Sequence, residues 1–133
     1  MTAHTILQPS AWARPKGYAN GVAAEGRLIF LAGQIGWNRH NVFECRDLVG
    51  QVRQCLQNIV EVLAEAGAKP EHVVSMTWYL TDKKDYLANS SGIGQAYREM
   101  MGRNFPAMAV VEVTALVEDA AKVEIQAMAV IPR

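Results

Sequence analysis

An apolar stripe with helical spacing follows Asp47 and ends near Gly67. The spacing predicts an amphipathic helix of about five turns, with Asp47 as the N-cap and Gly67 at the C-terminal end. A helix with one apolar face needs a second layer on which to bury that face. The residues that define the stripe are Val49, Val52, Leu56, Ile59, Val62, Leu63 and Ala66.

Segments with two-residue alternation can supply that second layer. Residues 72–82 alternate clearly, with Met76 and Trp78 on one face, and predict a strand. A second, shorter helix is predicted within residues 89–103. Further strands are predicted at residues 18–24, 27–34, 107–114 and 122–131.

The first two of these strands flank Glu25 and Gly26. We expect them to form a hairpin, because Gly26 can adopt the positive φ that a tight turn requires. The first seventeen residues lack periodicity and are predicted to be an extended lead-in.

The predicted order is β-β-α-β-α-β-β, in a single domain that spans residues 1–133. This order predicts a two-layer α+β fold, a mixed sheet with two helices on one face. The other face of the sheet would then be uncovered. Since it carries large apolar residues, we expect copies of the chain to associate through it.

Composition and charge exclude several functions. The chain has 13 basic and 13 acidic residues, so its charge does not favour binding to nucleic acid or an anionic membrane. No apolar run approaches the roughly 18 residues of a membrane span, and the N-terminus lacks a signal-peptide pattern. Cys45 and Cys55 form no CxxC pair, and the histidines lack ligand spacing, so we expect no metal and no cofactor. A cytoplasmic protein with reduced thiols is the expectation.

Five stretches carry a likeness to a known family. They are "GYANGV", "LAGQIGWN", "LAEAGAKPEHVVSMTWYLTD", "NFPAMAVVEV" and "KVEIQAMAV". In order and spacing, over residues 15–130, the chain resembles the Rid family (reactive intermediate deaminases, also called YjgF or L-PSP endoribonuclease-like proteins). The resemblance implies a chorismate-mutase-like (YjgF-like) fold, a homotrimer, and small-molecule clefts between subunits. Typical members hydrolyse 2-imino or 2-enamino acids to 2-keto acids and ammonia without a metal or cofactor.

The resemblance also implies roles for three residues. Glu124 matches the glutamate thought to orient the attacking water, and Tyr18 matches the cleft tyrosine. Gly33 matches the glycine whose backbone approaches the ligand. A carboxylate can hold or deprotonate a water, and a tyrosine hydroxyl can donate a hydrogen bond to the substrate. Without the resemblance, Glu124 would be interpreted as a solvated strand residue and Tyr18 as a packing aromatic.

At four other positions the chain departs from the family pattern. Met108 stands where the "FPAR" motif has the arginine that clamps a carboxylate, and Val110 where many members have a cysteine. Ala32 replaces a serine or threonine, and Gly94 replaces an asparagine. A charged hydrogen bond contributes roughly 1.5–3 kcal/mol, so the usual substrates should bind about 10- to 100-fold more weakly. The arginines that could substitute are Arg14, Arg39, Arg98 and Arg103.

These features predict a divergent, cofactor-free deaminase or hydrolase that acts on an enamine or imine. Trp37, in the loop after "GQIG", would suit a flat conjugated ligand, for example an aminomuconate-like product of aromatic breakdown. The alternative is a non-catalytic trimer that binds small molecules, since the four departures are all toward small or apolar residues. Ribonuclease activity is disfavoured by the zero net charge and by the lack of a His/Lys/Arg cluster.

Overall fold

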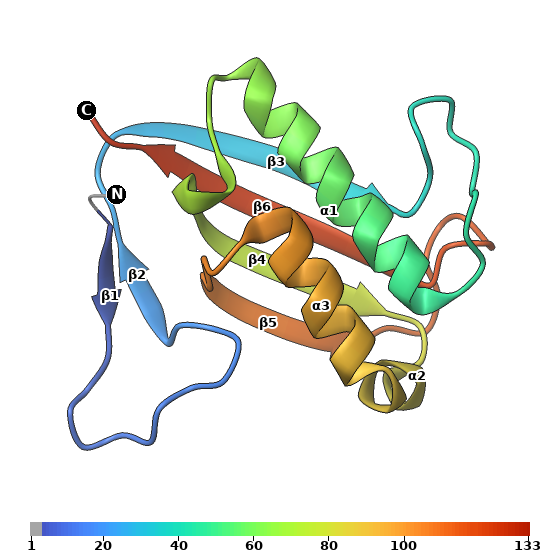
Figure 1. The fold of residues 1–133 in the computed structure, drawn as a ribbon, viewed down its shortest axis with the longest axis horizontal. Coiled ribbons are helices and arrows are strands. Elements are labelled where there is room, and N and C mark those ends of the chain that lie inside the picture. The colour runs from blue at the N-terminus through green and yellow to red at the C-terminus, as the bar shows by residue number, and fades with distance from the viewer. Residues whose placement is uncertain (1–3) are drawn as a thin grey trace.

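The computed structural model describes residues 4–133, which fold into a four-stranded sheet, helices on one of its faces, and a small two-stranded sheet beside it (Figure 1). Three helices and a short 3₁₀ turn are present in these residues. The elements are β1 (Thr5–Leu7), β2 (Gly21–Ala23), β3 (Arg27–Ile35), α1 (Leu48–Glu65), η1 (Pro70–His72), β4 (Val73–Leu80), α2 (Lys83–Ala88), α3 (Ser90–Met101), β5 (Ala107–Glu112) and β6 (Val123–Ile131).

The main sheet has the strand order β3-β6-β4-β5. β6 is antiparallel to both β3 and β4, whereas β4 and β5 are parallel. Parallel neighbours need a crossover connection, and α2 and α3 provide it between β4 and β5 (Figure 1). The mixed sheet was predicted, and the structure confirms it.

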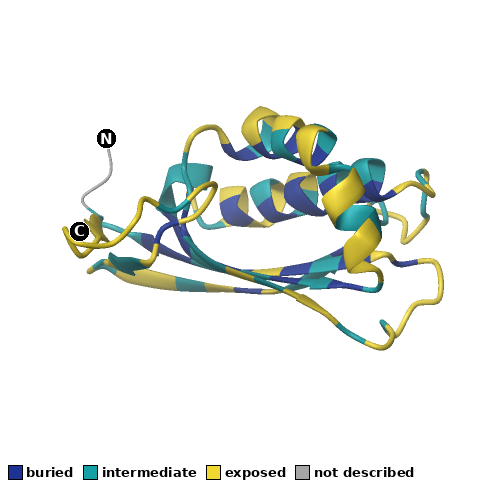
Figure 2. Cartoon of the chain, turned by 90° about the horizontal axis from the view of Figure 1, so that it is seen from below, coloured by how far each residue is buried: buried dark blue, intermediate teal, exposed yellow. Residues whose placement is uncertain are grey.

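The helices α1 and α3 cover one face of the sheet, and the opposite face carries no helix (Figure 2). α1 packs against β3 and β6, and α3 packs against α1. The predicted two-layer α+β fold is therefore confirmed. The core between the layers includes Val52, Leu56, Ile59 and Leu63 of α1, Met76, Trp78 and Leu80 of β4, Val123 and Ile125 of β6, and Ile93, Ala96 and Tyr97 of α3.

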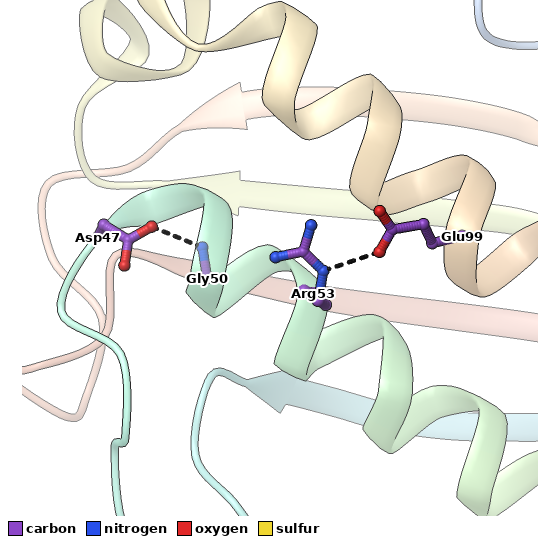
Figure 3. A network of polar contacts seen from close by, with 4 residues as sticks. All are labelled: Asp47, Gly50, Arg53 and Glu99. Carbon is purple, nitrogen blue, oxygen red and sulfur yellow. Dashed lines mark hydrogen bonds and ion pairs between the residues drawn. The ribbon is translucent and has the colours of Figure 1, made fainter.

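Polar contacts fix the start of α1 and its position beside α3 (Figure 3). The Asp47 carboxylate accepts a hydrogen bond from the Gly50 N–H at 2.9 Å, which confirms the predicted N-cap. The Arg53 guanidinium on α1 pairs with the Glu99 carboxylate on α3 at 3.1 Å. A partly exposed pair of this kind contributes less than about 1 kcal/mol, so it orients the two helices more than it stabilises them.

The predicted hairpin between residues 18–24 and 27–34 is wrong. β2 pairs with β1, and β3 pairs with β6 instead. Gly26 does have a positive φ, +146°, but it leads into β3 at the point where that strand begins to pair with the end of β6. Residues 5–7 of the predicted lead-in form β1, and residues 1–3 lie outside the described part.

The short helix α2 was not predicted. Its first turn is held by two acidic side chains: Asp82 accepts from the Lys84 N–H at 3.0 Å, and Glu112 of β5 accepts from the Lys83 N–H at 2.8 Å. Glu112, the acid within the apolar run of β5, therefore has a structural partner.

Candidate functional site

A cavity of about 480 Å³ lies where α3, β4 and β5 meet the segment that precedes β2. Aromatic rings form much of its wall. Tyr97 stacks on Phe105 with ring centroids 5.5 Å apart, and Trp78 lies 6.5 Å from Tyr97 and 6.3 Å from Tyr86. Such a wall favours a flat, apolar ligand body.

Backbone pairing places the rest of the wall. Ala19 forms an isolated bridge with Ala107, and its N–H donates to the Pro106 carbonyl at 3.0 Å, which holds Tyr18 beside β5. In the parallel ladder, Met108 lies beside Met76 and Val110 beside Trp78. Because Met76 and Trp78 belong to the core under the helices, Met108 and Val110 face the same side of the sheet.

Four of the residues singled out in the sequence therefore border one cavity: Tyr18, Gly94, Met108 and Val110. Tyr18 is 42% exposed, so its hydroxyl is accessible from solvent. A Cβ atom on Gly94 would lie 3.3 Å from Nη1 of Arg98, so the guanidinium lies over this glycine.

The polar groups of the cavity are mostly donors. Lys16 and Arg98 are its cationic lining residues, and no aspartate or glutamate lines it. The Tyr97 hydroxyl donates to the Asn104 carbonyl, and burial raises the pKa of this phenol, so it stays protonated. The buried indole N–H of Trp78 has no acceptor in the described residues.

Glu124 and Gly33 form a second group, away from this cavity. Glu124 alternates along β6 with the fully buried Val123 and Ile125, so its side chain lies on the face of the sheet without helices. A Cβ atom on Gly33 would lie only 2.1 Å from Oε2 of Glu124. The position of the carboxylate therefore requires a residue without a side chain at 33.

Cys55 lies in the core. Burial raises the pKa of its thiol well above the usual range, and the nearby Glu124 carboxylate raises it further. A thiol held in the protonated form is a poor nucleophile.

The remaining two candidates lie elsewhere. Ala32 is exposed on β3, and Trp37 packs against Phe43 in the loop that follows β3, with ring centroids 5.8 Å apart. Within one chain, the structure thus brings Tyr18, Gly94, Met108 and Val110 together and brings Gly33 to Glu124, but it does not unite these two groups.

Lys16 and Tyr86 line the cavity but were not predicted to belong to it, and Arg98 was named only as one of four arginines that could substitute there. Arg98 carried a usable signal, because it follows Gly94 by four residues on a predicted helix and must share its face. Tyr86 lies on α2, which the sequence did not reveal.

In residues 4–133, no cluster of three or more His, Cys, Asp and Glu side chains is arranged to bind a metal ion. None of the helices in this range combines the length and the apolarity that a membrane crossing requires.

Comparison with known proteins assigns the class. The family described as Endoribonuclease L-PSP matches residues 9–131. In structure, YyfB of Yersinia pestis, a member of the conserved Rid protein family, is similar with a TM-score of 0.87 and 30% identity, over 98% of this chain and 100% of YyfB. The chain belongs to this family, which includes the Rid and YjgF proteins.

Individual relatives are similarly close in sequence. The 2-iminobutanoate/2-iminopropanoate deaminase of Escherichia coli K12 is 33% identical over 126 residues, which cover 95% of this chain and 96% of the enzyme. A RutC family protein of Haemophilus influenzae is 33% identical over 105 residues, covering 79% of this chain and 80% of that protein.

Proposed function

We propose that this chain is a cofactor-free deaminase that hydrolyses an enamine or imine small molecule in a cleft between the subunits of a cytoplasmic homotrimer. The observation that carries the proposal is Glu124, a carboxylate held against the bare backbone of Gly33 on the sheet face without helices. The similarity to an imine deaminase over 95% of the chain supports the same reaction class.

The chemistry follows from the electrophilicity of a protonated imine. Glu124 holds a water and accepts one of its protons while the oxygen attacks the imine carbon. Glu124 then returns this proton to the nitrogen of the resulting carbinolamine. The C–N bond breaks, ammonia leaves, and the hydroxyl group loses its proton to become the carbonyl. The Tyr18 hydroxyl donates a hydrogen bond to the substrate and fixes its orientation.

Association of subunits would join the two groups. The uncovered face carries large apolar side chains that water now contacts, among them Phe30, which is 70% exposed. Burial of this face against neighbouring copies would create subunit interfaces. Glu124 and Gly33 of one subunit would there approach Tyr18 and Met108 of the next, and Ala32 and Trp37 would complete the cleft.

The cavity lining supports a substrate larger and flatter than a simple 2-aminoacrylate. Met108 and Val110 offer apolar contact. A conjugated enamine such as an aminomuconate-like product of aromatic breakdown fits such a wall.

The test is ammonia release from a panel of imines and enamines generated in situ, corrected for the rate in buffer. Glu124→Gln removes the base but preserves the shape of the side chain, and should lower the rate about 100- to 10,000-fold. Glu25→Gln makes the same change in the turn between β2 and β3 and serves as the control. A Glu124→Gln rate equal to that of the unaltered protein would remove Glu124 from the mechanism.

The second candidate is a trimer that binds small molecules without turnover. The apolar cavity of about 480 Å³ favours it, because binding there needs no water-positioning group. Ligand-induced thermal stabilisation, together with ammonia release no faster than in buffer across the panel, would select this function instead.

A further inference from the structure

We infer that Arg98, on α3, binds the carboxylate of the ligand in this chain. The inference depends on the proposed function only in taking this ligand to be a substrate. The binding itself can be measured without turnover.

The position of Arg98 is the first argument. Its guanidinium lies over Gly94, one helical turn earlier, where the lack of a side chain gives the guanidinium room at the cavity wall. The neighbouring residue Glu99 turns the other way and pairs with Arg53 of α1. Arg98 therefore keeps all its donors free: within residues 4–133, its guanidinium has no hydrogen-bond or ion-pair partner.

The charge of the cavity is the second argument. Arg98 and Lys16 are both cationic, and none of the lining residues is an acid that could neutralise them. Met108 and Val110, on the strand side, offer no donor from their side chains. An anion that entered would meet the guanidinium, whose planar fork matches the two oxygens of a carboxylate.

The other three candidate arginines from the sequence fit less well. Arg14 and Arg103 border a separate, more open cavity that shares only Tyr18 and Phe105 with this one. Arg39 is exposed in the loop after β3 and lines neither cavity.

The wall also constrains the rest of the ligand. Trp78, Tyr86, Tyr97 and Phe105 present aromatic surface beside the cation, and the Trp78 N–H lacks an acceptor in the described residues. A flat, conjugated carboxylate would place its charge at Arg98 and its apolar body against these rings. The ligand class is therefore a conjugated or aromatic carboxylic acid.

The experiment compares two probes of one shape, cinnamate and cinnamamide, by isothermal titration calorimetry against the full-length protein. We expect the carboxylate to bind more tightly than the amide, and Arg98→Gln to weaken cinnamate binding about 10- to 100-fold with little change for cinnamamide. Arg98→Lys keeps the charge but loses the fork, so it should retain part of the preference. Arg39→Gln, an identical charge change outside the cavity, should retain all of it.

The inference would be overturned if the Arg98→Gln variant kept the full preference for cinnamate. It would be overturned equally if the preference were lost in Arg14→Gln or Arg103→Gln instead. Equal binding of both probes to the unaltered protein would also overturn it. These outcomes are independent of ammonia release, so failure of the deaminase proposal with intact, Arg98-dependent binding would be recognised as such.

Discussion

Gly33 is the residue at which the candidate site has least room for change. Its backbone lies so close to Glu124 that a methyl group would overlap the carboxylate. The three atoms nearest to that methyl group all belong to the Glu124 side chain. A substitution here should therefore rotate the carboxylate away without disturbing the strands.

Gly33→Ala is predicted to lower ammonia release by at least about 10-fold while changing the melting temperature little, because the displaced group is the end of a flexible side chain. The measurement is a double-mutant cycle with Glu124→Gln. If Gly33→Ala acts through the carboxylate, it should cause no further loss in the Glu124→Gln background. Additive losses would show that residue 33 affects the reaction by another route.

Within one chain, the residues that the sequence matched to a cleft lie in separate groups. Gly94 and Met108 were matched to one cleft, and they do line one cavity. Glu124 was matched to that same cleft, but strand alternation puts it on the opposite face of the sheet. Arg98 was one of four candidates and was not preferred among them, because a sequence does not say which arginine lacks an acidic neighbour. The pairing of Glu99 with Arg53, which leaves Arg98 free, exists only in the packed helices.

At the scale of elements, local sequence signals predicted helix spacing and caps reliably, but they did not predict which strands pair. The spacing of α1 and its Asp47 cap were predicted closely, since both depend on neighbours in the chain. Gly26 was correctly assigned a positive φ, but the strands around it do not pair with each other. β3 and β6 are each nine residues long and pair on both sides of a register shift between Leu31 and Gln34, whereas β2 has only three residues. The longer ladder satisfies more backbone groups, and this competition is invisible to a local turn signal.

Gly26→Ala is predicted to destabilise the protein by at least about 3 kcal/mol, because the new methyl group would meet the Ile131 carbonyl and the φ value would be strained. Gly67→Ala is the matched control. Gly67 also has a positive φ, but open space surrounds it, so its cost should be about 1 kcal/mol. Urea unfolding at equal protein concentration gives both values. An equal loss of stability at the two positions would contradict the close approach of Gly26 to the Ile131 carbonyl.

At the scale of the whole molecule, the sheet is covered on one side only (Figure 2). Leu28 and Phe30 on β3 are 57% and 70% exposed, and Val111 on β5 is 42% exposed. Phe30 pairs with Met128 across the β3–β6 ladder. These two residues, together with Thr77 and Gln126, border a groove on this face. Large apolar side chains that are this exposed are a cost in water, and contact with a partner copy would remove that cost.

Phe30→Glu is therefore predicted to convert a homotrimer, with three times the 14.6 kDa mass of the chain, into monomers, because a carboxylate buried in a subunit interface would be desolvated without a partner. Size-exclusion chromatography with light scattering measures the mass, and ammonia release should fall with it, since each cleft would need two subunits. Val117→Glu adds the same charge at a side chain that is 97% exposed in the turn before β6, and should leave both mass and rate unchanged. A monomeric mass for the unaltered protein would contradict the proposed assembly. A trimeric Phe30→Glu variant would show instead that the subunits meet through another face.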